Sequence, residues 1–183
     1  MKPIKTLITI LFISLLSSPS WSVTIRDLVK RDDLYYEKFT DVPYTGKVTV
    51  DEQVKHMDVE GVFKNGKAEG AWIEYWLGQL WRKGNFKNGK EDGAWVYYHD
   101  DGQLSSKGNY KNGKREGAWI GYHNNGQLNY KGNYKNGKKG GAWVGYNENG
   151  TVDKSLTGTF KNGKKISDWL LSKLIKGSRK SQL

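Results

Sequence analysis

Residues 108–128 read GNYKNGKREGAWIGYHNNGQL, and this one stretch contains the features that decide the fold. Its opening motif is a glycine, one further residue, an aromatic residue and Lys-Asn-Gly-Lys, and it also starts at Gly61, Gly84, Gly132 and Gly158. The steps between these glycines are 23, 24, 24 and 26 residues. A nearly fixed period of this length predicts a repeat protein in which each unit packs mainly on its neighbours.

Each repeat has the turn chemistry of a β-hairpin. Asn112-Gly113 stands between two lysines, and Asn-Gly is the pair that best tolerates the positive φ angles of a type I′ turn. A second turn follows at Asn125-Gly126, and the runs between turns are rich in Trp, Tyr, Val and Leu. We therefore expect an all-β chain of tandem hairpins that forms an elongated antiparallel sheet, growing by about 10 Å per repeat.

Each complete repeat continues with Gly-Ala-Trp and has an aromatic residue three positions after the tryptophan. The predicted structural residues are Trp72, Trp95, Trp119 and Trp143, with Gly70, Gly93, Gly117 and Gly141. We expect the indoles to be buried between adjacent hairpins. Side chains three apart on a regular strand point to opposite faces. Either both faces therefore carry aromatic rows, or a bulge brings each Trp and its Tyr together, and the sequence leaves both arrangements open.

With these motifs the chain resembles the MORN family, in the bacterial variant with the pattern G-x-[FY]-K-N-G-K-x-[ED]-G-x-W. The resemblance covers residues 44–165 and divides them into the half-repeat 44–60, the repeats 61–83, 84–107, 108–131 and 132–157, and the half-repeat 158–165. The resemblance implies a role in protein scaffolding or membrane contact. Similar proteins are often labelled as a YwqK-type antitoxin family, which implies an antitoxin-like interaction role, although a cytosolic antitoxin would need no export signal.

The N-terminus has the organisation of a secretory signal peptide. Lys2 and Lys5 precede an apolar run over residues 7–16, and small residues stand before a cleavage point after Ser22. We assign residues 1–22 to a signal peptide and expect the mature protein to be periplasmic or secreted. The alternative is an uncleaved N-terminal anchor. The chain contains no cysteine, so disulfides cannot stabilise an exported product.

The two ends of the repeat domain should carry caps, because exposed sheet edges attract other strands. Residues 23–43 form a lead-in, and its first part, residues 23–30, is either a short helix or an edge strand. Residues 166–183 are interpreted as a short amphipathic capping helix with a basic tail, since Ile166, Trp169, Leu170 and Leu174 have helical spacing. The alternative for this helix is contact with a membrane surface.

The sequence offers no catalytic, cofactor-binding or metal-binding constellation, and we predict a protein that is not an enzyme. The three histidines are His56, His99 and His123, and none has the spacing of a metal motif. We expect His99 and His123 to be solvated. One acid recurs in three of the repeats, as Glu69, Asp92 and Glu116. A catalytic pair is singular, so we expect these acids to pair with turn lysines on neighbouring strands.

The formal charge of +11 is spread over the Lys-rich turns, which suits weak attraction to anionic surfaces. The candidate binding surface consists of Lys87, Lys90, Lys111, Lys114, Lys135 and Lys138. We expect an exported scaffold for a protein partner and no cofactor. The alternative partner is an anionic membrane or envelope surface, phospholipid or lipopolysaccharide. Export disfavours nucleic acid, and the sequence leaves the oligomeric state open.

Overall fold

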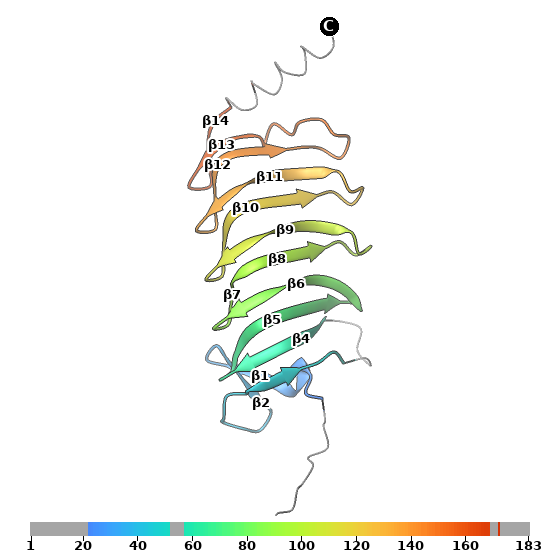
Figure 1. Ribbon diagram of the computed structural model, residues 1–183, viewed down its shortest axis with the longest axis vertical. Coiled ribbons are helices and arrows are strands. Elements are labelled where there is room, and N and C mark those ends of the chain that lie inside the picture. The colour runs from blue at the N-terminus through green and yellow to red at the C-terminus, as the bar shows by residue number, and fades with distance from the viewer. Residues whose placement is uncertain (1–21, 52–56, 169–171, 173–183) are drawn as a thin grey trace, which may run out of the picture.

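The computed structural model describes residues 22–51, 57–168 and 172, and it shows one long antiparallel sheet built from hairpins (Figure 1). The sheet has 12 strands in the order β14-β13-β12-β11-β10-β9-β8-β6-β5-β4-β3, with β7 paired to β6. The all-β repeat fold predicted from the sequence is therefore confirmed. Its strands are β3 (Gly46–Val48), β4 (Met57–Lys64), β5 (Lys67–Trp76), β6 (Gln79–Lys87), β7 (Lys90–Glu91), β8 (Gly93–Tyr98), β9 (Leu104–Lys111), β10 (Lys114–Tyr122), β11 (Leu128–Lys135), β12 (Lys138–Gly145), β13 (Gly158–Lys161) and β14 (Lys164–Ser167).

The Asn-Gly turns connect the ends of consecutive strands along one side of the sheet, and they stack on each other. All five asparagines have φ of 51° or 52°, and the glycines that follow have φ between 74° and 84°, as a type I′ turn requires. Each stacked turn is tied to the repeat before it by a backbone hydrogen bond. The amide of Gly113 donates to the carbonyl of Glu91 at 2.9 Å, and that of Gly137 donates to the carbonyl of Arg115 at 2.9 Å.

The tryptophans are buried against glycines of the neighbouring strands. Trp72, Trp95, Trp119 and Trp143 are 5, 0, 1 and 1% exposed. Trp119 is paired with Gly108 on one side and Gly132 on the other. A Cβ atom built on Gly108 would lie 2.3 Å from the indole of Trp119, so the ring occupies the space that any side chain there would need. The indole nitrogen donates to the carbonyl of Asn109 at 3.0 Å.

A bulge precedes each tryptophan and explains the glycine of the Gly-Ala-Trp motif. The pairing of β10 with β9 shifts register between Glu116 and Trp119, and Gly117 in this interval has φ of 70°. A left-handed residue inside a strand is the mark of a glycine bulge, because other residues adopt it at a cost. The same conformation recurs at Gly70, Gly93 and Gly141, with φ of 74°, 78° and 68°.

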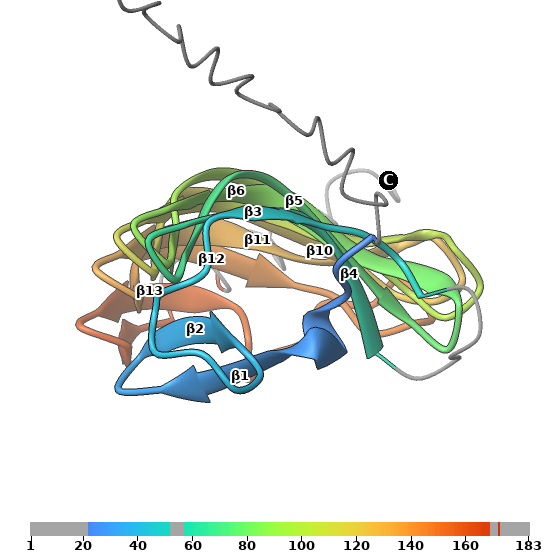
Figure 2. The same cartoon turned by 90° about the horizontal axis from the view of Figure 1, so that it is seen from below.

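The N-terminal lead-in covers the first repeat. It contains a short 3-10 turn (η1, Ile25–Asp27) and the hairpin of β1 (Leu28–Arg31) with β2 (Leu34–Glu37). This hairpin lies against one side of the arched sheet (Figure 2). Tyr35 packs on Phe63 of β4 with ring centroids 4.7 Å apart, and its amide donates to the carbonyl of Gly66 at 2.8 Å. The lead-in therefore protects the end of the tryptophan row, with Leu28 in the same core cluster.

The helix predicted to begin at Ile166 does not begin there. Ile166 and Ser167, which the sequence assigns to that helix, belong to β14, where Ser167 pairs with Thr159 of β13. Backbone pairing with β13 therefore overrides the helical spacing at this point. Trp169, Leu170 and Leu174, which complete the predicted helix, lie outside the described residues, as do residues 1–21 of the predicted signal peptide. In the described part of the chain, no helix has the length and hydropathy needed to cross a bilayer.

The contact between indole and glycine predicts a position-specific cost of adding a methyl group. Gly108→Ala should lower the free energy of unfolding by about 1–3 kcal/mol, because the new Cβ must displace the buried indole of Trp119. Gly140→Ala is the matched control, since a Cβ there meets nothing within 4 Å, and it should change stability by less than about 0.5 kcal/mol. Urea denaturation of the two variants measures both values, and equal effects would contradict the interlocking.

Candidate functional site

The two faces of the sheet have different roles. Successive side chains of a strand alternate between faces. We call the face that carries the four indoles the Trp face and the opposite one the groove face. Lys83 lies 5.7 Å above the ring of Tyr98, so the tyrosine three residues after Trp95 is on the groove face with that lysine. Both faces therefore carry aromatic rings, which decides between the two arrangements left open by the sequence.

Cationic side chains close the Trp face. The guanidinium of Arg115 lies 4.3 Å from the ring centroid of Trp119, and the ammonium of Lys139 lies 4.5 Å from that of Trp143. Burial pulls the pKa of Arg115 down, but hydrogen bonds to Tyr110 and Tyr134 outweigh burial and leave the pKa above its ordinary value. Burial lowers the pKa of Lys139. The indoles are covered by the chain's own residues and are not a ligand platform.

A buried ion pair between Glu74 and Arg82 stabilises the Trp face in the first repeats. Glu74 is only 6% exposed, and its carboxylate accepts from Arg82 in a bidentate pair at 2.6 and 2.8 Å. The same carboxylate accepts from the indole nitrogen of Trp72 at 3.1 Å. Burial lowers the pKa of Arg82, but its bonds to Glu74 and Tyr97 dominate and raise the pKa. This buried pair is part of the fold and leaves no charge for a ligand.

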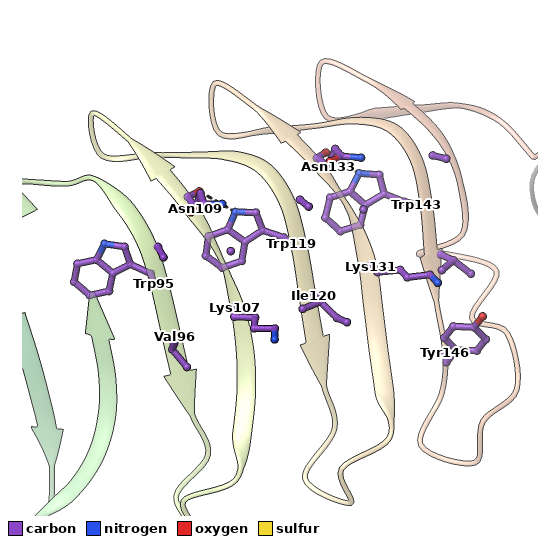
Figure 3. A pocket seen from close by; sticks show the side chains of 16 residues that line it. Trp95, Val96, Lys107, Asn109, Trp119, Ile120, Lys131, Asn133, Trp143 and Tyr146 are labelled. Atoms are coloured by element: carbon purple, nitrogen blue, oxygen red, sulfur yellow. Dashed lines mark hydrogen bonds between the residues drawn. The ribbon is translucent and has the colours of Figure 1, made fainter. Parts of the chain in front are cut away.

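The groove face contains a groove of about 880 Å³ that crosses three repeats. Two rows of side chains define it. The aliphatic–lysine row consists of Val96, Lys107, Ile120, Lys131 and Val144, which are paired in register from one strand to the next. The alanine–asparagine row consists of Ala94, Asn109, Ala118, Asn133 and Ala142, which also line the groove. Figure 3 shows Val96, Lys107, Ile120 and Lys131 following one another on successive strands.

The composition of the two rows explains why a groove forms there. Ala94, Ala118 and Ala142 are exposed but short, so they make a low floor beside the longer side chains of the other row. Lysine stems are apolar, so Lys107 and Lys131 add hydrophobic wall as well as charge. Val144 is only 7% exposed, whereas Lys107 and Lys131 are exposed. The groove therefore combines an apolar lining with cations that the fold itself does not use.

The predicted lysine surface is exposed and follows the stacked turns. All six of its lysines are solvent-exposed: Lys87, Lys90, Lys111, Lys114, Lys135 and Lys138. Lys90, Lys111 and Lys114 line a small hollow of about 340 Å³ together with Asn112, Asn136 and Glu116. Equivalent residues of adjacent repeats are two strands apart, which is about 9.6 Å. The turns thus gather three of the predicted lysines around one hollow.

The sequence predicted that the repeat acids pair with turn lysines, and this prediction is wrong. Each carboxylate instead accepts a hydrogen bond from the backbone N–H of the asparagine in the next turn: Glu69 from Asn88 at 2.7 Å, Asp92 from Asn112 at 3.3 Å and Glu116 from Asn136 at 2.8 Å. No ion pair among the described residues joins one of these acids to a turn lysine. The acids therefore tie each turn to the next, and the fourth repeat has Gly140 in their place.

The histidines also connect repeats, and the expectation that they are solvated is wrong. The Nε2 atom of His99 lies 3.1 Å from the carbonyl of Tyr122, and that of His123 lies 2.7 Å from the carbonyl of Tyr146. Both side chains are half-buried. His56 lies outside the described residues. Within the described ranges, no group of three His, Cys, Asp or Glu side chains could hold a metal ion.

The groove is the feature that sequence reasoning missed. Its signal is present in the sequence. A lysine precedes three of the repeat glycines, at Lys83, Lys107 and Lys131, and Ile or Val follows each of the four repeat tryptophans. These residues become neighbours only when the register between strands is known. The pairing of Lys107 with Val96 and Ile120 makes one row of residues that are 11 and 13 positions apart in the chain.

Comparison with known families agrees with the repeat geometry. The model of the MORN repeat variant matches residues 91–112 and 115–136, two consecutive repeats that span β7 to β11. No curated protein matches the chain. The remaining units have the same repeat pattern, in sequence and in structure, as the two units that the family model matches. MORN repeats form a non-catalytic family and are typically protein-binding or membrane-binding modules.

The hydrogen bond between each repeat acid and the next turn predicts that removing the acid speeds amide hydrogen exchange in that turn. Glu116→Ala should make the amide of Asn136 exchange faster with solvent, because it removes the acceptor of that amide. The free energy of unfolding should fall by about 0.5–1.5 kcal/mol, the usual net value of one hydrogen bond. Amide hydrogen exchange measures the first effect. Glu148→Ala, at an exposed acid in another turn, is the control, and unchanged exchange at Asn136 in the Glu116 variant would contradict this hydrogen bond.

Proposed function

We propose that this repeat protein is a non-enzymatic scaffold that holds a protein partner in the groove of the groove face. The observation that carries the proposal is the groove itself, which crosses three repeats and exposes aliphatic and lysine side chains. The Trp face is closed by Arg82, Arg115 and Lys139, so the groove face is the broad surface open to a ligand. The typical role of MORN repeats as binding modules supports the same reading.

The chemistry of the groove suits binding better than catalysis. Its lining residues are Ala, Val, Ile, Trp, Gly, Asn, Lys and Tyr, and this lining includes no carboxylate, histidine or cysteine. A general acid–base pair or an activated nucleophile needs such groups at fixed positions. The export predicted from residues 1–22 belongs to the proposal, and the partner is then a protein of the envelope or the exterior.

Filling the groove should abolish capture of the partner. Ala118→Gln places a longer, uncharged side chain on the groove floor, and the exposed position should leave stability within about 0.5 kcal/mol of the original. Affinity capture from a native envelope extract should then lose the partner that the unchanged protein retains. The control is Ala71→Gln, because Ala71 is also exposed and follows the same motif but lies outside the groove lining. Equal capture by both variants would refute the groove as the binding site.

A second candidate function is binding to an anionic membrane or envelope surface. The observation that favours it is the hollow lined by Lys90, Lys111 and Lys114 at the stacked turns. Lysine ammonium groups at the edge of a sheet can meet several headgroups at once, so weak contacts add up over the array.

Vesicle sedimentation separates this candidate from the scaffold. Anionic phospholipid vesicles should bind the protein at about 0.1 M salt and release it at about 1 M, because the screening length falls from about 10 to about 3 Å. The combined variant Lys90→Gln, Lys111→Gln and Lys114→Gln should bind several-fold more weakly. A control with Lys30→Gln, Lys38→Gln and Lys154→Gln removes the same formal charge at positions outside the stacked Asn-Gly turns. Binding that is identical in the two triple variants would exclude a role for the turn lysines.

A further inference from the structure

We infer that the groove binds an extended acidic segment in the polyproline II conformation, with a carboxylate at every third residue. The inference rests on the proposed scaffold function and names the chemistry of the partner. It follows from the charge of the groove, the spacing of its lysines and the exposed amides of its floor.

The charge of the groove calls for an acidic partner. Lys107 and Lys131 line it, and its lining contains no carboxylate that could neutralise them. Lys83 continues the same row toward the N-terminus, beside the ring of Tyr98. All three lysines are exposed. In the ion pairs of the described residues none of the three takes part. A segment with carboxylates would therefore meet Lys107 and Lys131 inside the groove, and Lys83 where the row continues beyond it.

The row of lysines has two defined ends. The position before the repeat glycine is Glu60 in the first unit and Thr157 in the last, with lysine in the three units between. Thr157 is fully buried, and its hydroxyl accepts from the amide of Gly145 at 2.9 Å. An acid at one end and a buried hydroxyl at the other limit the row to three cations. A segment with carboxylates at residues i, i+3 and i+6 is long enough to meet all of them.

The spacing of the lysines selects the conformation. Neighbouring lysines of the row are two strands apart, or about 9.6 Å along the array. A polyproline II helix has three residues per turn and rises about 3.1 Å per residue, so residues three apart lie on one side and about 9.3 Å from each other. The mismatch is about 0.3 Å per repeat. Three carboxylates therefore stay in step with three lysines.

Other regular conformations fit the row less well. In a β-strand, residues three apart point to opposite faces, so alternate carboxylates would leave the groove. In an α-helix, seven residues rise about 10.5 Å, which overshoots each repeat by about 0.9 Å, and the seventh residue is also rotated by about 20°. The polyproline II segment satisfies both distance and direction.

The floor of the groove suits the backbone of such a segment. A polyproline II chain makes no internal hydrogen bonds, so its carbonyl groups need outside donors. The side chains of Asn109 and Asn133 are exposed and make no side-chain hydrogen bond to another described residue. Their amides can donate to these carbonyls once per repeat. The low alanine positions between them leave room for proline rings, and Figure 3 shows Asn109 and Asn133 on the strands next to Trp119 and Trp143.

Two synthetic peptides with equal charge test the register. The peptide with four Glu-Pro-Pro triplets places its acids about 9.3 Å apart, and the peptide with four Glu-Pro-Pro-Pro units places them about 12.4 Å apart. Fluorescence polarisation with the full chain should show at least about ten-fold tighter binding of the triplet peptide, because its contacts act together. Equal affinities would overturn the inference, since only charge would then be recognised.

Matched variants locate the binding site. Lys107→Gln with Lys131→Gln should weaken binding of the triplet peptide by about five-fold or more. The control pair Lys38→Gln and Lys154→Gln removes the same charge from exposed positions outside the groove and should have little effect. Circular dichroism and tryptophan fluorescence confirm that each variant is folded. Equal loss in both pairs would overturn the assignment of the site.

Two further outcomes separate this inference from the scaffold proposal. If Ala118→Gln abolishes capture of a protein partner but neither peptide binds, the scaffold stands and the polyproline II partner is wrong. If a linear acidic polysaccharide binds more tightly than the triplet peptide and depends on Lys107 and Lys131, the groove recognises a glycan, and both proposals fail. Tighter binding of the triplet peptide that is lost in the lysine variant supports both.

Discussion

The contact between a tryptophan ring and a glycine backbone is the constraint on which this structure depends. The indole of Trp119 occupies the volume where a side chain of Gly108 would stand. Since only glycine leaves that volume empty, each strand that receives an indole must present one residue without a side chain. The contact thereby fixes the register of every hairpin against the next and buries a large apolar ring in a single-layer sheet. Nearly constant spacing of the repeats follows from it.

Because the Trp face supplies the burial, the groove face has little part in the core. Antiparallel sheets commonly bury one face and leave the other in water, and here the fully buried indoles belong to one side. The groove face can then carry Lys107, Asn109 and Ala118 without a cost in stability, and their side chains are available to a partner. The cations on the Trp face have the opposite role, since Arg115 and Lys139 lie over indoles and are withdrawn from binding. Positively charged side chains thus stabilise the fold on the Trp face and are available for binding on the groove face.

Local chemistry could be predicted from the sequence, and pairing across strands could not. The Asn112-Gly113 turn and the burial of Trp119 each follow from residues close together in the chain. The partner of Glu116 is a backbone amide 20 residues away, and any residue type could have supplied it. The helical spacing that begins at Ile166 yields, at Ile166 and Ser167, to the pairing of β14 with β13. The groove was missed for the same reason, because its rows run across the strands.

The number of repeats that carry the lysine row limits the length of the partner segment that the row can bind. A repeat surface binds through several weak and equal contacts, so affinity depends on how many repeats engage together. The lysine row ends at Glu60 on one side and at the buried Thr157 on the other, although the hairpins themselves continue beyond both positions. The structure thus separates the sheet, which needs neighbours for stability, from the shorter part of it that carries the lysine row. A partner segment longer than about seven residues gains nothing more from this row, since three carboxylates in polyproline II register already span about 19 Å.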